Sequence, residues 1–259
     1  MAVEPQLVGH EPVSETFRGG TANIAGTLVP QLHFVLDGGG GVFFEHHTLL
    51  WKDAQLQIGL KKLPGGIKRK IAGMDFFLTL TSGPGEIAFS MDTPGRVLTH
   101  HIDPGQTLLV REHQFLAATD NLDYTFERVQ GVRSMMFGGT GIFVDKFQAK
   151  NDRASVWIHA AGDLFEVQLG QGEQIDVEAG SWLYRDSAVR MEAVTMGLKS
   201  GMFGGGGKLT WNRFTGPGRL GIQTMFFNPA ELVGDGASTA ATAGLGGLIG
   251  AAVAKGVSG

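Results

Sequence analysis

Residues 122–126, Leu-Asp-Tyr-Thr-Phe, alternate apolar and polar side chains. Residues 56–60 (Leu-Gln-Ile-Gly-Leu) and 189–193 (Val-Arg-Met-Glu-Ala) repeat the same apolar positions. Successive side chains on a strand point to opposite faces, so this alternation is typical of a strand with one buried face. The three stretches are 66 and 67 residues apart, which indicates that one structural unit occurs three times.

The repeat extends beyond these strands. When the three copies are aligned without a gap on Gly39, Gly105 and Gly172, seven alignment columns are apolar in every copy. Chance predicts about one or two such columns in a window of this size. The columns are Val42, Leu108 and Ile175; Phe44, Val110 and Val177; Leu49, Phe115 and Trp182; Leu50, Leu116 and Leu183; Trp51, Ala117 and Tyr184; Leu56, Leu122 and Val189; and Ile58, Tyr124 and Met191.

We therefore expect an all-β body over residues 1–230, built from three repeats at about 18–83, 84–150 and 151–230. A unit of this size would bury only a modest core by itself. Three units that share an axis can bury their inner faces together. The spacing thus predicts one compact body with pseudo-threefold symmetry.

Turn residues recur with the same spacing. Gly83-Pro84-Gly85 and Gly216-Pro217-Gly218 are 133 residues apart, and Asn151-Asp152 lies between them. Proline presets the backbone of a turn, and a following glycine supplies its positive φ. The sequence predicts structural turns at Pro84 and Pro217, and also at the anchor residues Gly39, Gly105 and Gly172.

Composition excludes several classes of protein. The chain of 259 residues has 41 glycines, which favours many tight turns, and no cysteine, which excludes disulfides and thiolate sites. The N-terminal stretch lacks the basic and apolar regions of a secretory signal, so we expect a cytoplasmic protein. The net charge of −4 gives no general attraction to nucleic acid, which is not an expected partner.

Two glycine-rich motifs resemble nucleotide sites but fail on context. Residues 216–221 fit the pattern GxGxxG, yet a proline lies in the turn and a strand rather than a helix follows. Residues 201–210, GMFGGGGKLT, look like a phosphate loop. However, Met202 occupies the position of its first glycine, and Leu209 occupies the position of its Ser or Thr. We therefore expect turns at both places and no cofactor.

The histidines do not form a recognisable metal motif. They include the pairs His46-His47 and His100-His101, and adjacent residues of a strand face opposite ways. No His-x-His occurs, and only His47 and His113 share a column of the repeat. We assign no metal ligand, and we interpret these histidines as surface or structural residues.

No catalytic residue is assigned either. The chain has no G-x-S-x-G nucleophile motif. A Ser/His/Asp set can still assemble from distant parts of a chain, so this alternative stays open.

The strongest local charge is a run of cations with no acidic residue. It comprises Lys61, Lys62, Lys68, Arg69 and Lys70. One interpretation is a solvent-exposed loop between strands. The other is a contact with anions such as phosphates or lipid headgroups.

Residues 231–259 form a C-terminal tail that is mostly glycine and alanine. One interpretation is a flexible terminus. The apolar spacing also fits a short helix that docks on the body, on a sister subunit or on a membrane surface. The residues at helical spacing are Leu245, Leu248, Ile249, Ala252 and Val253.

Three stretches resemble a known family: residues 65–90 (GGIKRKIAGMDFFLTLTSGPGEIAFS), 101–110 (HIDPGQTLLV) and 136–144 (MFGGTGIFV). They are similar to the "altered inheritance of mitochondria twenty-four" family, formerly a domain of unknown function. The resemblance implies a fold like that of the tryptophan RNA-binding attenuation protein, with three short double-stranded β-helix units around a pseudo-threefold axis. Fungal members are linked to mitochondrial inner-membrane organisation. The resemblance carries no site residue over to this chain.

From these observations we expect a non-enzymatic interaction or scaffold protein that self-associates as a homo-oligomer. Its partner is another protein or a second copy, and peripheral membrane contact would use the tail or the basic run. The alternative is a module that binds a small ligand or anion in a pocket between repeats. A metal-dependent enzyme is the least favoured hypothesis.

Overall fold

The computed structural model describes residues 6–7, 12–61, 78–128, 143–196 and 209–225. These residues belong to one compact unit, which spans Met1–Val132 and Ile142–Phe226. The expected all-β class is confirmed, because every described element is a strand except one short 3₁₀ turn. None of the described residues forms a helix long and apolar enough to cross a bilayer.

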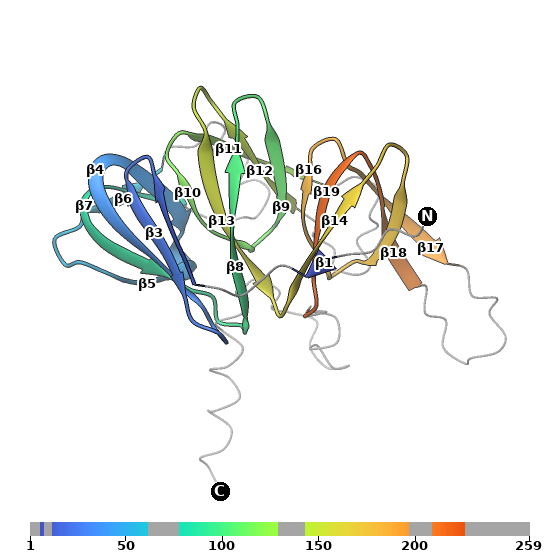
Figure 1. The fold of residues 1–259 in the computed structure, drawn as a ribbon, viewed down its shortest axis with the longest axis horizontal. Helices are drawn as coiled ribbons and strands as arrows, with labels where there is room; N and C mark the ends of the chain where they lie inside the picture. Colours follow the sequence, from blue (N-terminus) through green and yellow to red (C-terminus); the bar gives the residue numbers. More distant parts are fainter. Residues whose placement is uncertain (1–5, 8–11, 62–77, 129–142, 197–208, 226–259) are drawn as a thin grey trace, which may run out of the picture. The chain divides into compact units, whose positions relative to one another are not determined.

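Figure 1 shows the described strands in chain order. Up to residue 102 the elements are β1 (Gln6–Leu7), β2 (Val13–Phe17), β3 (Gly20–Ala25), β4 (Gln31–Glu45), η1 (His46–Thr48), β5 (Leu49–Lys52), β6 (Ile58–Leu60), β7 (Leu78–Phe89) and β8 (Gly95–Ile102). The next are β9 (Thr107–Arg111), β10 (Phe115–Thr119), β11 (Leu122–Arg128), β12 (Phe143–Ala149) and β13 (Ala154–Ala161). The last are β14 (Leu164–Leu169), β15 (Gln174–Glu178), β16 (Trp182–Asp186), β17 (Arg190–Met196), β18 (Leu209–Thr215) and β19 (Gly218–Gln223).

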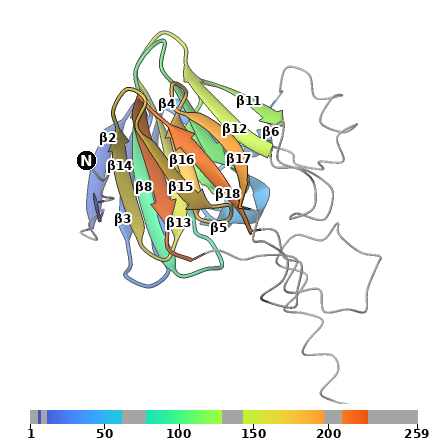
Figure 2. The same ribbon diagram turned by 90° about the vertical axis from the view of Figure 1, so that its right-hand side faces the viewer.

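The strands form three antiparallel sheets that mix the predicted repeats. In a nine-stranded sheet, β10 pairs with both β4 and β13 and thereby joins strands of all three repeats. A seven-stranded sheet runs in the order β1-β14-β19-β16-β9-β12-β11, and a three-stranded sheet in the order β15-β18-β17. Figures 1 and 2 show how these sheets curl. The threefold symmetry stays a prediction, and β7 crosses the expected boundary between residues 83 and 84.

Among the residues that the structure describes, two hydrophobic clusters form the core, and β4 contributes to both. Phe43 joins the cluster that contains Phe115 and Phe147. Its neighbours Val42 and Phe44 point the other way, into the second cluster. Because the side chains of a strand alternate between faces, this segment of β4 is buried on both sides.

The alternation that indicated the fold is confirmed at residues 122–126. Leu122 and Tyr124 are buried there, while Asp123 and Thr125 are exposed. In residues 189–193, Val189 is buried, and Met191 and Ala193 are half-buried.

The same prediction is wrong in residues 56–60. Leu56 is buried, but Ile58 is exposed and Leu60 is 70% exposed. The reason is the position of β6, which pairs with β7 alone among the described strands. A period-two pattern buries a face only where another layer covers that face.

Three of the predicted turn residues lie between strands. Pro217 lies between β18 and β19. Gly105 and Gly172 precede β9 and β15 with φ of 84° and 76°, in the left-handed region that glycine adopts without steric cost.

The turn predictions at Gly39 and Pro84 are wrong, because both residues lie inside strands. Pro84 is part of β7 and pairs with Asp37 of β4, where the register shifts before Gly41. Gly39 lies in this irregular stretch and donates its N–H to Asp37 Oδ1 at 2.7 Å. A bulge does not require a full ladder of hydrogen bonds, so it accommodates a proline that has no N–H to donate.

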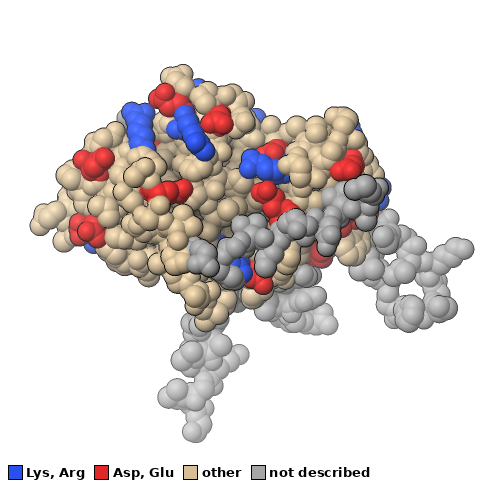
Figure 3. Space-filling model, in the orientation of Figure 1, with Lys and Arg blue, Asp and Glu red and all other residues tan. Residues whose placement is uncertain are grey.

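Charges of both signs are interspersed over the face shown in Figure 3. On the face in Figure 3, Lys and Arg side chains lie among Asp and Glu side chains, and the coloured residues form no extended patch of one sign. This distribution agrees with the small net charge of −4. Of the basic run, only Lys61 lies within the described residues; Lys62, Lys68, Arg69 and Lys70 lie outside them, as does the tail at 231–259.

Candidate functional site

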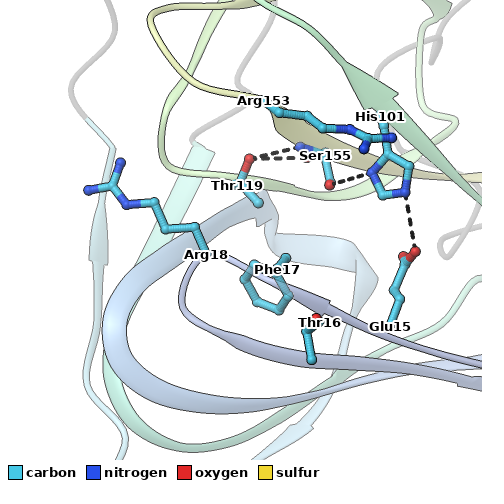
Figure 4. A pocket seen from close by; sticks show the side chains of 8 residues that line it. All are labelled: Glu15, Thr16, Phe17, Arg18, His101, Thr119, Arg153 and Ser155. Atoms are coloured by element: carbon cyan, nitrogen blue, oxygen red, sulfur yellow. Dashed lines mark hydrogen bonds and ion pairs between the residues drawn. The ribbon is translucent and has the colours of Figure 1, made fainter.

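A pocket of about 440 Å³ lies where β2, β8, β10 and β13 come together (Figure 4). Strands from the N-terminal segment and from the second and third predicted repeats therefore contribute to it. Its walls combine hydroxyl, imidazole, carboxylate, guanidinium and aromatic groups. The lining residues are Glu15, Thr16, Phe17, Arg18, His101, Thr119, Arg153 and Ser155.

A chain of hydrogen-bonding groups crosses the pocket. His101 and Ser155 face each other directly in the β8–β13 ladder, and His101 Nδ1 lies 3.0 Å from Ser155 Oγ. The other ring nitrogen, Nε2, lies 3.4 Å from Glu15 Oε2. The imidazole thus lies between a hydroxyl, aligned with it by antiparallel pairing, and a carboxylate from β2 (Figure 4).

The apolar wall of the pocket belongs to the second core cluster. The ring of Phe17 packs edge-on against Phe34 and Trp157, with centroids 5.4 and 5.3 Å apart. The indole N–H of Trp157 donates to Glu15 Oε1 at 3.1 Å. These contacts anchor β2 to β13 and keep Glu15 in place.

Two arginines supply positive charge at the pocket. Figure 4 shows Arg153 beside His101, whereas Arg18 extends outward from the opposite wall. Arg18 Nη1 is 4.0 Å from Asp152, and Arg153 Nε is 3.7 Å from Asp103. Ion pairs this long between exposed side chains are weak, so both guanidinium groups can turn toward a bound anion.

The Ser155–His101–Glu15 arrangement has the composition of a catalytic triad. It lacks two features that a nucleophilic serine uses, namely a free backbone N–H for the oxyanion and a sharp turn that presents the hydroxyl. The N–H of Ser155 donates to Thr119 Oγ1 at 3.0 Å, so it is not available to stabilise an oxyanion. Ser155 also lies within the regular β8–β13 ladder rather than on a sharp turn that would present its hydroxyl. The arrangement is better suited to donating and accepting hydrogen bonds with a ligand.

The one described residue of the basic run points to the interior. The ammonium of Lys61 lies 3.8 Å from the centroid of the Phe43 ring. Burial lowers the pKa of Lys61 below its ordinary value. The contact is a cation–π interaction, so this lysine is engaged within the fold. The predicted anion contact of the whole run stays a prediction.

A second polar group lies at the end of β4. Glu45 Oε2 is 3.5 Å from His47 Nδ1 and 3.9 Å from His113 Nδ1. Burial lowers the pKa of His47, against the opposing effect of Glu45. Burial also acts to lower the pKa of His113, but its hydrogen bond with Glu45 and the nearby carboxylates raise it above its ordinary value.

The strand argument for the histidine pairs holds for one pair. His100-His101 lie on β8, where His100 is buried and His101 faces the pocket. His46-His47 lie in the 3₁₀ turn η1 rather than on a strand, and of the two it is His47 that is paired with Glu45.

Sequence reasoning missed the residues of the pocket. Glu15 and Arg18 belong to the segment before the repeated strands, and Ser155 lies in an apolar strand. No spacing or motif connects them. Strand pairing aligns Ser155 with His101, and side-chain contacts with Trp157 bring β2 beside β13. Two sequence signals concerned a site, namely the basic run and the shared column of His47 and His113, and neither belongs to this pocket.

The comparisons with known proteins concern the whole β body. Residues 22–225 match the family model described as "Mitochondrial biogenesis AIM24". The chain belongs to this family. The match runs from within β3 to the end of β19, and it includes four of the eight pocket residues and the whole Glu45 group. Residues Glu15 to Arg18 lie before its first matched position.

The AIM24-family fold is also found in a solved structure. The chain is similar to a crystal structure of a Streptococcus pyogenes protein, with a TM-score of 0.61 and 21% sequence identity. The match covers 82% of this chain and 95% of the other. At this identity the similarity shows the fold alone. A search of functionally curated proteins finds no match.

Proposed function

We propose that this AIM24-family protein is a non-enzymatic binding protein that takes a small anionic molecule into the pocket of Figure 4. The observation that carries the proposal is that Arg153, His101 and Ser155 come together in one cavity, whose opposite wall includes Arg18. The ligand would carry a carboxylate or phosphate, because guanidinium groups bind both in a bidentate manner.

The volume and chemistry of the pocket support this ligand class. A cavity of about 440 Å³ is within the size range of small-molecule sites. Two arginines outweigh the single lining carboxylate, and Glu15 is already engaged by Trp157 and His101. Phe17 supplies an apolar wall for the uncharged part of the ligand. Binding without chemistry fits the engaged N–H of Ser155.

Isothermal titration of the full chain with inorganic phosphate and with a panel of small mono- and dicarboxylates tests the proposal. At least one compound should bind with a stoichiometry of one per chain. The double variant Arg18→Ala/Arg153→Ala should weaken that binding at least about tenfold, since each lost charge-assisted hydrogen bond contributes about 1.5–3 kcal/mol. Arg190→Ala is the matched control, because Arg190 is an exposed arginine on β17, away from the pocket residues.

Two outcomes would count against the proposal. Binding that is equal in the double variant and the wild type would place the ligand elsewhere. Ester or amide hydrolysis by the purified chain that disappears in Ser155→Ala would show that Ser155 is a nucleophile. That result would replace the binding function with an enzymatic one.

Self-association is a second candidate function, favoured by the edge formed by β5 and β6. Both strands pair with β7 alone among the described strands. Leu50, Trp51, Ile58 and Leu60 are exposed on them. An edge with exposed apolar side chains is a template for another strand, and two identical edges can pair around a twofold axis. We therefore take a second copy of this chain as its partner.

Light scattering coupled to size exclusion tests this candidate. The wild type should form a dimer whose fraction rises with concentration, and Leu50→Lys/Leu60→Lys should be monomeric. Leu28→Lys is the control, because Leu28 is equally exposed but lies between β3 and β4. A monomer at every concentration, or a dimer unaffected by the edge variant, would exclude this interface. The cytoplasmic location and membrane contact through the basic run or tail stay predictions, which cell fractionation and vesicle sedimentation would test.

A further inference from the structure

Glu45 is a buried carboxylate whose Oε2 faces two imidazoles. Its side chain is 3% exposed, and the partners of Oε2 among the described residues are His47 and His113, both farther away than a short hydrogen bond. An ionised carboxylate is costly to bury unless cations or hydrogen-bond donors surround it. The position therefore calls for a positive charge close to Oε2.

Two imidazole nitrogens lie close to this oxygen. Nδ1 of His47 is 3.5 Å from it and Nδ1 of His113 is 3.9 Å from it. The ligand atoms of the three residues all lie within 4.8 Å of one another. Ligands of a tetrahedral ion with bonds of about 2.0–2.2 Å are separated by about 3.3–3.6 Å. The separations from Glu45 thus agree with shared coordination to within a few tenths of an ångström.

The backbone places these ligands on connected but distinct elements. Glu45 ends β4, His47 lies in η1, and His113 lies between β9 and β10. His113 has a φ of 65°, a conformation that non-glycine residues seldom adopt. His47 and His113 occupy one column of the repeat, in which the third unit has Gly180. The first two repeats therefore each contribute one imidazole.

A further carboxylate supports the arrangement. Glu112 Oε1 lies 3.5 Å from Nε2 of His113, on the side of the ring opposite to Glu45. Metal-bound histidines usually direct their second ring nitrogen to such a group, which fixes the ring and increases the basicity of the ligand. Here the carboxylate would orient Nδ1 toward the shared position.

We infer that Glu45, His47 and His113 bind one divalent first-row transition metal ion, with Zn²⁺ as the representative. Two imidazoles and one carboxylate suit this class and disfavour Mg²⁺ and Ca²⁺, which take mostly oxygen ligands. His47 and His113 are 44% and 45% exposed, so an ion can enter from solvent. Three protein ligands leave at least one coordination position for water.

The experiment titrates Zn²⁺ and Co²⁺ separately into the full chain after treatment with a chelator. Calorimetry should give one site per chain, and Co²⁺ should develop visible ligand-field absorption. Zn²⁺ should also raise the melting temperature, because it binds the folded state alone. Mg²⁺ at the same concentration should give none of these signals.

Variants locate the site. His47→Ala and His113→Asn should each weaken binding at least about tenfold, and Glu112→Gln should do so by about ten- to a hundredfold. Asparagine is chosen at His113 because it tolerates positive φ. His46→Ala is the matched control, because His46 is an exposed neighbour that is not part of the group. Circular dichroism should confirm that each variant is folded. Glu45→Gln tests the third ligand and preserves the shape of the buried side chain.

The inference is overturned if neither ion binds, or if Co²⁺ binds His47→Ala, His113→Asn and Glu45→Gln as well as it binds the wild type. In the first case the two histidines serve only as ion-pair partners of Glu45. In the second case the ion uses other ligands. Neither result affects the anion pocket, whose residues are different.

Discussion

The imidazole of His100 packs edge-on against the ring of Tyr184, with 4.1 Å between the centroids. Both side chains are buried, and the Tyr184 hydroxyl donates a hydrogen bond to Glu166. His100 lies on β8 and Tyr184 on β16, so the contact links the nine-stranded and seven-stranded sheets. Burial and, next, the charge of Arg219 lower the pKa of His100 to about 3.

The first prediction concerns the loss of stability in acid. Burial also lowers the pKa of His159, to about 4. Both residues are neutral in the folded state, whereas in the unfolded chain they gain protons below a pH of about 6.5. The contribution of these two histidines to stability is therefore fully present above pH 6.5 and is lost as the pH decreases toward 4 and 3. Each histidine contributes a slope of up to about 1.4 kcal/mol per pH unit.

Urea denaturation at a series of pH values measures this slope. His100→Phe should flatten the curve between pH 6 and about 4, because phenylalanine fills the same space against Tyr184 and does not titrate. His46→Ala, at an exposed histidine, should leave the curve unchanged. An acid slope that is identical in wild type and His100→Phe would contradict the assignment.

The alternation of apolar and polar residues predicted the β class and the strand at residues 122–126. Burial was also predicted correctly at this strand, because a core layer covers the face that its apolar side chains share. The identical pattern at residues 56–60 wrongly predicted a buried face, because β6 pairs with β7 alone among the described strands. Likewise, Gly83-Pro84-Gly85 has a local preference for a turn. In the fold, the long pairing of β4 with β7 keeps Pro84 within a strand, beside a bulge. Position within a sheet depends on distant strands, and a local window does not contain that information.

The candidate sites show the same limit. Ser155 and His101 are direct neighbours across the β8–β13 ladder although 54 residues separate them in sequence. Nothing in either local sequence marks a pocket. His47 and His113 were partly predictable, because the repeat places them in one column. Their partner Glu45 occupies a column that holds Arg111 and Glu178 in the other units, so the ligand set was not apparent as a repeated motif.

The second prediction concerns the ion pair between Arg96 and Asp163. The arginine side chain is 6% exposed, the aspartate is 52% exposed, and Nη2 donates to Oδ1 at 2.6 Å. Asp163→Ala leaves a nearly buried guanidinium without this acceptor and should lower the free energy of unfolding by about 2–3 kcal/mol. Asp123→Ala breaks an exposed pair with Lys150 and should cost under about 1 kcal/mol. Equal losses in the two variants, measured by urea denaturation, would refute the role of burial.

The third prediction concerns Gly95 at the start of β8. A Cβ at this position would collide with the carbonyl oxygen of Ala160 and lie 2.7 Å from Cε1 of His159. Gly95→Ala should therefore displace β8 from β13 and cost about 2–3 kcal/mol or more. Because the same ladder aligns His101 with Ser155, the variant should also weaken ligand binding in the pocket. Gly59→Ala has open space around the added carbon and should be nearly neutral in a thermal melt.

The last prediction concerns Glu15, which connects β2 to the core and to the pocket. Its Oε1 accepts the indole N–H of buried Trp157, and its Oε2 lies beside His101 Nε2. Glu15→Ala leaves a buried donor unsatisfied and should lower the free energy of unfolding by about 1–3 kcal/mol. Glu15→Gln retains an oxygen acceptor for the indole and should recover most of this loss.

Glu15→Gln also separates structure from electrostatics at the pocket. Removing the only lining carboxylate, while keeping the hydrogen bond to Trp157, leaves Arg18 and Arg153 without an opposing charge among the lining residues. Affinity for the anion should rise two- to fivefold, by roughly 0.4–1 kcal/mol for one like charge removed at a partly exposed site. Calorimetry at low and high salt measures it, and the gain should shrink as salt screens the charge. Weaker binding in Glu15→Gln would mean that the ligand brings a cation to Glu15 rather than an anion to the arginines.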